Sequence, residues 1–117
     1  MRLEVRKFLY DMRRAADALA TFTDGRTFDD YQSDAMLRSA VERQFEIIGE
    51  ALGRLAQVDV ETSERISDHR RIIAFRNVLI HGYADVDDRL VWGVLERDLS
   101  TLRAEVEALL AANEIAN

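Results

Sequence analysis

Cysteine and proline are both absent from this chain of 117 residues, and glycine occurs only five times. Without cysteine, the chain has no disulfide, no thiolate metal ligand and no cysteine nucleophile. Tight turns depend mainly on glycine and proline, so we expect long helices joined by short loops. The length is typical of one domain, and we expect residues 1–117 to fold as a single unit.

Long apolar runs are missing as well. No stretch approaches the ~20 apolar residues that a membrane span needs, and the basic N-terminal residues are not followed by the apolar core of a signal peptide. The formal net charge of -6 argues against broad electrostatic binding of nucleic acid. We therefore expect a cytoplasmic protein without a membrane partner, in which any contact with RNA is local.

Apolar residues recur at alternating spacings of four and three, which predicts amphipathic helices. The expected helices cover Leu3–Thr23, Asp30–Gln57, Asp68–His81 and a last segment that starts after Val86. Their apolar positions are Val5, Leu9, Met12, Ala16 and Leu19; Val41, Phe45, Ile48, Leu52 and Leu55; Ile72, Ile73, Phe75, Leu79 and Ile80; and Val91, Leu95, Leu99, Leu102, Val106 and Leu109. The fold class is therefore all-α, an antiparallel four-helix bundle.

Polar residues at the helix ends predict where each helix starts. Thr27 and Asp29 are candidate caps of the second helix, Asp68 of the third and Asp87 of the fourth. The polar connector between the second and third helices is expected to form one short extra helical turn at Ser63–Ser67.

Two small residues lie one turn apart in the second helix, Gly49 and Gly53. Each costs up to ~1 kcal/mol relative to alanine, so we expect them to allow another helix to approach closely, within the bundle or across a dimer. Glu46 and Glu50 have the same spacing, but a di-metal helical bundle needs a histidine three residues after such a glutamate. No metal site is expected.

The segment from His69 to His81 contains three arginines, both histidines of the chain and no acid. Arginine offers a fixed positive charge and a planar donor fork that suits phosphate oxygens. Histidine can give or take a proton near neutral pH. Cleavage of a phosphodiester by a ribose 2′-OH needs both a proton shuttle and a cation for the developing charge. Arg76 and His81 are the candidates for these two roles.

Helix geometry complicates this interpretation. Five residues turn through about 500°, so Arg76 and His81 point roughly 140° apart. Gly82 suggests a left-handed cap that leaves His81 at the helix end, where it could be re-aimed; a two-fold partner could also bring a second pair to the same cleft. Spacing alone leaves open that Arg76 forms a surface ion pair and that His81 caps the helix. His69 fits a solvated residue at the helix start.

The residues Arg76, His81 and Tyr83 form the pattern Arg-x4-His-x-Tyr, which resembles the signature of the HEPN superfamily, and specifically of HepT-like toxins from HepT/MNT toxin–antitoxin systems. Asn77 follows the arginine, as it commonly does in that family. The segment from Phe45 to Ala51 is similar to the family's glycine-glutamate-alanine segment, and Val91-Trp92 and Asp98-Leu99 have counterparts in its last helix.

The resemblance implies a HEPN-like homodimer that acts as a metal-independent endoribonuclease toxin of a type VII-like system, without a cofactor. It implies that Arg76 and His81 are the catalytic pair and that Asn77 and Glu50 support them. It also implies that Tyr83 accepts AMP from an MNT-type nucleotidyltransferase antitoxin, which neutralises the toxin. The RNA substrate would then be excluded by the added negative charge and bulk.

Two other functions remain open from the sequence. The first is a non-catalytic helical module that uses the same cleft to bind a nucleotide or a nucleotidyltransferase. The second is a purely structural dimer. Arg76 and His81 occurring together favour the nuclease, although a ligand-binding descendant of a nuclease could retain both residues.

Overall fold

The computed structural model describes residues 1–82 and 86–116, with side chains as far as residue 112. It consists of α1 (Leu3–Thr23), α2 (Phe28–Ser33), α3 (Ala35–Val58), α4 (Val60–Glu64), α5 (His69–His81) and α6 (Asp88–Ala116). The described residues contain no β-strand. The predicted all-α class is confirmed.

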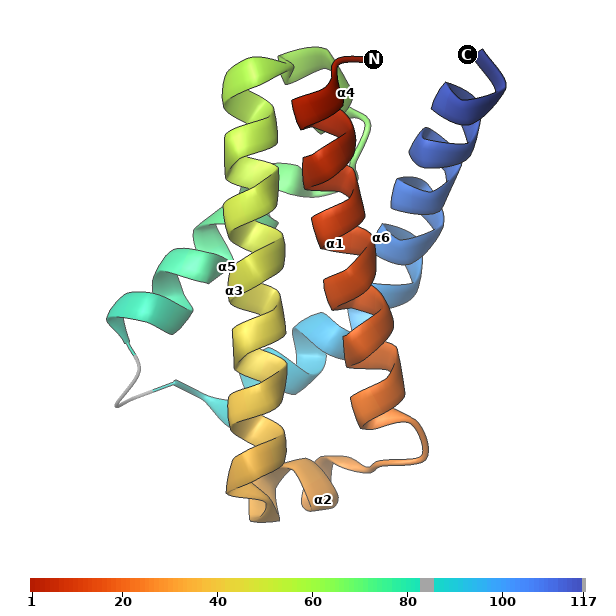
Figure 1. Cartoon of the computed structure of the whole chain (residues 1–117). Helices are drawn as coiled ribbons and strands as arrows, with labels where there is room; N and C mark the ends of the chain where they lie inside the picture. The colour runs from red at the N-terminus through yellow and green to blue at the C-terminus, as the bar shows by residue number, and fades with distance from the viewer. Residues whose placement is uncertain (83–85, 117) are drawn as a thin grey trace.

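The two central helices, α1 and α3, run antiparallel and pack along most of their length (Figure 1). Helix α5 packs against α3, and α6 packs against α1. All the apolar positions predicted for the first two helices are buried. In α5, however, Ile80 is exposed, and in α6 Leu110 rather than Leu109 is fully buried. An apolar pattern with a 3.5-residue period drifts around a helix of 3.6 residues per turn, which accounts for the shift at the end of the long α6.

The prediction of one helix over Asp30–Gln57 is wrong, because the chain breaks at Asp34. Residue Thr27 starts α2 with a capping box: its hydroxyl accepts from the Asp30 N–H, and the Asp30 carboxylate accepts from the Thr27 N–H. Asp34 then takes an extended conformation (φ -121°, ψ 100°), and its carboxylate accepts from the Leu37 N–H at 3.1 Å to start α3. Two capped starts so close together define two helices.

The short extra turn lies earlier than predicted. It is α4, and it begins after Asp59, whose carboxylate accepts from the Thr62 N–H and hydroxyl at 3.1 and 2.7 Å. These hydrogen bonds lower the pKa of Asp59. The predicted cap Asp87 does accept from the Arg89 N–H at 2.9 Å just before α6.

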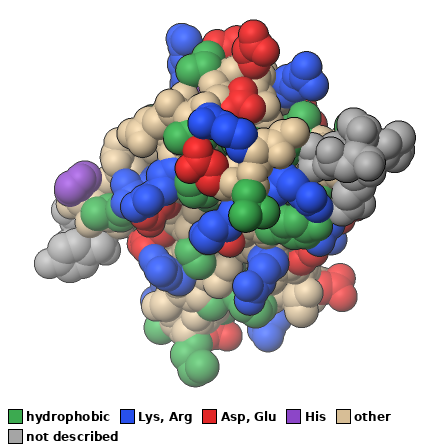
Figure 2. All heavy atoms as spheres, turned by 45° about the horizontal axis from the view of Figure 1, so that its top comes forward, with side chains coloured by type: hydrophobic (Ala, Val, Ile, Leu, Met, Phe, Trp, Pro, Cys, Tyr) green, Lys and Arg blue, Asp and Glu red, His purple; other side chains and the backbone are tan. Residues whose placement is uncertain are grey.

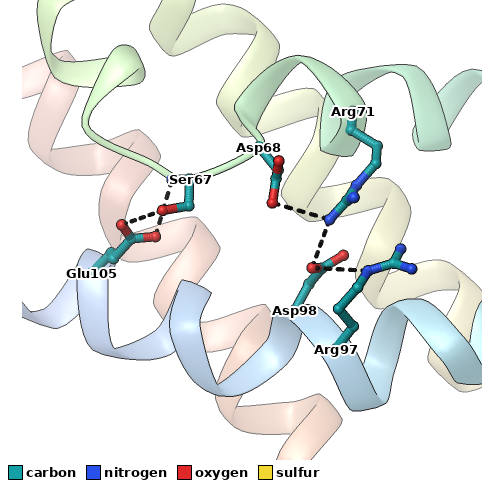
Figure 3. Close-up of polar contacts among 6 residues, drawn as sticks. All are labelled: Ser67, Asp68, Arg71, Arg97, Asp98 and Glu105. Carbon is teal, nitrogen blue, oxygen red and sulfur yellow. Dashed lines mark hydrogen bonds and ion pairs between the residues drawn. The ribbon is translucent and has the colours of Figure 1, made fainter.

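A polar network joins the start of α5 to the middle of α6 (Figure 3). Arg71 donates to Asp98 at 2.8 Å and to Asp68 at 3.1 Å, while Ser67 donates to Glu105 through its N–H and its hydroxyl. Asp68 precedes α5 in the left-handed conformation (φ 57°), and its side chain pairs with Arg71 instead of capping the helix as predicted. The network therefore fixes the direction in which α5 leaves the bundle.

The C-terminal end of α5 points away from the α1–α3 pair (Figure 1). Among the described residues, no helix is long and apolar enough to cross a membrane.

Candidate active site

Three buried apolar side chains, Ile72, Phe75 and Leu79, fix the rotation of α5 about its own axis. With these side chains facing the bundle, Arg76 is half-buried on the flank of α5 that faces α3. His81 lies about 140° further around the helix and is exposed. Within one chain, the two predicted catalytic side chains therefore point to different sides of α5.

The turn at the end of α5 does not bring them together. Gly82 has a φ of -105°, so the predicted left-handed cap is wrong. The chain instead continues the helical turn, and the Gly82 N–H donates to the Val78 carbonyl at 2.9 Å. A side chain at position 82 would lie 2.9 Å from that same oxygen, which explains the glycine. His81 consequently keeps the direction that the helix gives it.

An open groove of about 550 Å³ is lined by residues of both α3 and α5. Its lining residues come from both helices: Gly49, Glu50, Gly53, Arg54, Gln57, Ile73 and Arg76. A Cβ atom at Gly49 would lie 2.5 Å from the Cβ of Arg76, which is closer than real Cβ atoms approach. The expectation of close helix packing at this glycine is confirmed, and the packing occurs inside the bundle. Gly49 therefore allows α5 to bring Arg76 against α3.

Among the described residues, Arg76 has one charged partner in the groove, Glu50. Its Nη2 lies 3.9 Å from Oε2 of Glu50, and its Nε is buried without a hydrogen-bond partner among the described residues. A buried N–H that lacks a partner is costly unless a ligand or water satisfies it. The Nε end of the guanidinium is thus enclosed by packing, while the side chain as a whole lines the groove and is 32% exposed.

Glu50 contacts a second arginine that was not predicted as part of the site. Its Oε1 lies 3.3 Å from Nη2 of Arg54, one turn further along α3. The spacing of Glu50 and Arg54 is a signal for such a pair in the sequence. That Arg76 reaches the same carboxylate depends on how α5 packs against α3, which spacing does not reveal.

The other predicted site residues lie on the outer side of α5. Asn77 and His81 are both exposed, and the imidazole of His81 makes no hydrogen bond to another described residue. With Arg70, Ala74 and Val78 they form one exposed stripe along the helix, called here the α5 stripe. It contains no acidic residue. Tyr83, the predicted AMP acceptor, lies outside the described residues.

Clusters of three or more His, Cys, Asp or Glu side chains that could hold a metal ion do not occur within the described part of the chain. The positively charged or titratable donors at this site are the guanidinium groups of Arg54 and Arg76 in the groove and the imidazole of His81 on the α5 stripe. The fold and the site together define an all-α helical domain with a cationic groove suited to a phosphate-bearing ligand.

Comparison with known proteins identifies the family to which the domain belongs. The chain belongs to the HepT-like ribonuclease family: the family model described as "Ribonuclease HepT-like" matches residues 12–109. The resemblance to the HepT-like members of the HEPN superfamily is confirmed.

Individual relatives agree with the family model over nearly the whole chain. A candidate RNase of Methanocaldococcus jannaschii is 33% identical over 104 residues, which cover 89% of this chain and 94% of the relative. A protein of Thermococcus cleftensis named "Probable ribonuclease HepT" is 30% identical over 109 residues, with 93% and 98% coverage. A candidate RNase of Caldanaerobacter subterraneus is 29% identical over 105 residues, with 90% and 93% coverage. No solved structure matches the chain significantly.

Proposed function

We propose that this protein is a metal-independent endoribonuclease that acts as a homodimer. The main support is that a member of the HepT-like ribonuclease family has Arg76 anchored in an open groove and His81 exposed on the same helix. Because these side chains diverge within one chain, a second copy is needed to bring an arginine and a histidine to one phosphate. The acid-free α5 stripe is the surface on which such a copy would be placed.

The proposed reaction starts with attack of a ribose 2′-OH on the adjacent phosphorus. The new 2′-O–P bond forms while the bond from phosphorus to the 5′-oxygen breaks, leaving a 2′,3′-cyclic phosphate and a 5′-OH end. His81 takes the proton of the 2′-OH or supplies the proton to the leaving 5′-oxygen. Arg76 stabilises the added negative charge on the phosphorane. Asn77 and Glu50 orient these groups, and no metal or cofactor takes part.

The proposal is tested by cleavage assays on the full-length protein. Cleavage is expected to persist in EDTA. His81→Ala should lower the rate by about 10²–10⁴-fold, the usual contribution of general acid–base catalysis, and Arg76→Ala by about 10²–10³-fold. The same helix offers a matched control, His69→Ala, which should retain activity. Circular dichroism checks that each variant is folded.

Unchanged cleavage in folded His81→Ala would contradict the mechanism. RNA or nucleotide binding without any cleavage by the wild-type protein would instead favour a non-catalytic binding module that uses the same groove.

We further propose that this ribonuclease is the cytoplasmic toxin of a HepT/MNT toxin–antitoxin system and that an MNT-type nucleotidyltransferase neutralises it. The tyrosine oxygen of Tyr83 would attack the α-phosphorus of ATP, forming a Tyr–AMP ester and releasing pyrophosphate. Tyr83 is close in sequence to His81, so a bulky anion there would repel RNA from the site. Incubation with the cognate nucleotidyltransferase and ATP should add AMP to Tyr83 and nothing to Tyr83→Phe; AMP found on another residue would refute this assignment.

A further inference from the structure

Two arginines from different helices share one carboxylate in the groove between α3 and α5. Oxygen Oε1 of Glu50 lies 3.3 Å from Arg54, and Oε2 of the same side chain lies 3.9 Å from Arg76. Two cations and one anion leave one positive charge at this point. Since the whole chain carries a net charge of -6, this is a local reversal of the protein's overall charge.

The groove has room for a ligand beside these charges. Its volume of about 550 Å³ is within the range of roughly 300–1,000 Å³ that small-molecule sites occupy. Gly49 and Gly53 place no side chains over it. Arg76 lines the groove with a side chain that is 32% exposed, and the Arg54 side chain is 62% exposed, so both guanidinium groups can reach an anion in the groove.

We propose that Arg54 and Arg76 form a phosphate-binding subsite for the RNA backbone. In it, Arg54 contacts a phosphate next to the scissile one, while Glu50 pairs with both guanidinium groups, one through each of its oxygens. The inference rests on the proposed ribonuclease function, because RNA is the ligand it assigns to the groove. Arg54 is a binding residue in this arrangement and takes no part in proton transfer.

The chain contains a close control for Arg54. Arg43 lies about three helical turns earlier on the same face of α3, roughly 16 Å away along the axis. It is 65% exposed and pairs with Glu46 at 3.4 Å, as Arg54 pairs with Glu50. It does not line the groove. Lys and Arg side chains are spread over the face in Figure 2, with acidic side chains between them, so a control for general surface charge is needed.

The test measures binding separately from cleavage. In a His81→Ala background, which slows turnover, the affinity for a fluorescein-labelled single-stranded RNA of mixed sequence is measured by anisotropy across a range of KCl concentrations. Arg54→Ala should weaken binding about 3- to 10-fold at low salt. It should also reduce the slope of log Kd against log salt by about 0.7, the value for one phosphate contact on a single strand. Arg54→Lys should restore most of the slope, and Arg43→Ala should change neither quantity.

Cleavage by otherwise wild-type protein gives the second readout. Arg54→Ala should raise KM and leave kcat within about two-fold, because the contact is made equally before and during the reaction. Equal effects of Arg54→Ala and Arg43→Ala, or an unchanged salt slope in Arg54→Ala, would overturn the subsite.

The two proposals can fail separately. If wild-type protein cleaves RNA while Arg54→Ala binds it normally, only the subsite is wrong. If the protein binds RNA through Arg54 without cleaving it, the subsite stands and the nuclease proposal is wrong. If it neither binds nor cleaves RNA, both are wrong.

Discussion

Gly49 is the residue whose size decides where Arg76 lies. Both Cβ atoms belong to rigid backbone, so an alanine at position 49 cannot be accommodated by rotating a side chain, and α5 must move away from α3. Gly53, one turn further along α3, provides the contrast. A Cβ there would meet nothing nearer than Cγ2 of Ile73 at 4.0 Å, an ordinary contact.

Gly49→Ala is therefore expected to destabilise the fold. Overpacking lowers the free energy of unfolding by about 1–3 kcal/mol. The higher helix propensity of alanine raises it by up to ~1 kcal/mol, which offsets only part of that loss. The control Gly53→Ala has the higher helix propensity of alanine and creates no steric clash. It should therefore be more stable than wild type by up to ~1 kcal/mol. Urea unfolding followed by circular dichroism measures both. Equal stability of the two variants would show that α5 does not approach α3 as closely as described.

At the scale of the helices, α2, α3 and α6 meet around the ring of Tyr31. This ring is fully buried, its centroid lies 5.3 Å from that of Trp92 in α6, and its hydroxyl has no hydrogen-bond partner among the described residues. Glu42 of α3 lies at the same junction, with Asp88 of α6 nearby. Burial raises the pKa of Tyr31 far above its usual value.

The Glu42 carboxyl gives this junction a pH dependence. Burial is the main cause that raises its pKa above the ordinary 4.5; Asp88 and Glu46 add to the shift, and Arg38 opposes it. A raised pKa means that the folded state binds this proton more tightly than the unfolded state. The stability that Glu42 contributes is present below pH 4.5 and is lost as the pH rises through the raised pKa.

Glu42→Gln should consequently have a higher Tm than wild type at pH 7, since the amide carries no charge to desolvate. The difference should shrink when the pH is lowered to about 4, where the wild-type carboxyl becomes protonated. Thermal unfolding at the two pH values measures this. Glu107→Gln, at an exposed position of α6, should leave Tm unchanged at both pH values. A Glu42→Gln variant less stable than wild type at pH 7 would contradict the assignment.

The sequence predicted a helix correctly where one apolar pattern runs along its whole length, and it failed where the structure depends on the backbone of a single residue. The apolar spacing predicted the bounds of α1 correctly, because one continuous helix has one pattern. It did not reveal the break at Asp34, although Asp30 and Asp34 each occupy a recognisable capping position. Periodicity averages over many residues, whereas the break depends on the backbone of one.

The same limit applies to the site. Arg76 and His81 could be selected from their chemistry and placed on one helix. The groove, and the contact of Arg76 with the carboxylate that also binds Arg54, depend on the packing of α5 against α3 across the gap left by Gly49. Residues far apart in sequence produce that geometry, so no spacing within one helix predicts it.

At the scale of the whole molecule, the proposed active site needs two chains. An interface between identical copies related by a two-fold axis uses the same surface on both, and the α5 stripe is the exposed surface that contains His81. Val78 on this stripe is an apolar side chain that is 45% exposed. Burial of this side chain against a second copy would remove it from water.

Val78→Asp should therefore produce a folded monomer that has lost most of its cleavage activity, because two unpaired carboxylates would be buried at the centre of the interface. Sedimentation velocity gives the oligomeric state, circular dichroism the fold, and the RNA assay the activity. Met36→Asp, which changes an apolar side chain that is 84% exposed at the start of α3, is the matched control and should remain dimeric and active. A Val78→Asp variant that stays dimeric and cleaves RNA at the wild-type rate would place the second copy elsewhere. If the wild-type protein cleaved RNA as a monomer, Arg76 and His81 of the same chain would have to reach one phosphate. The regular helix of α5 opposes this, because it points the two side chains in different directions.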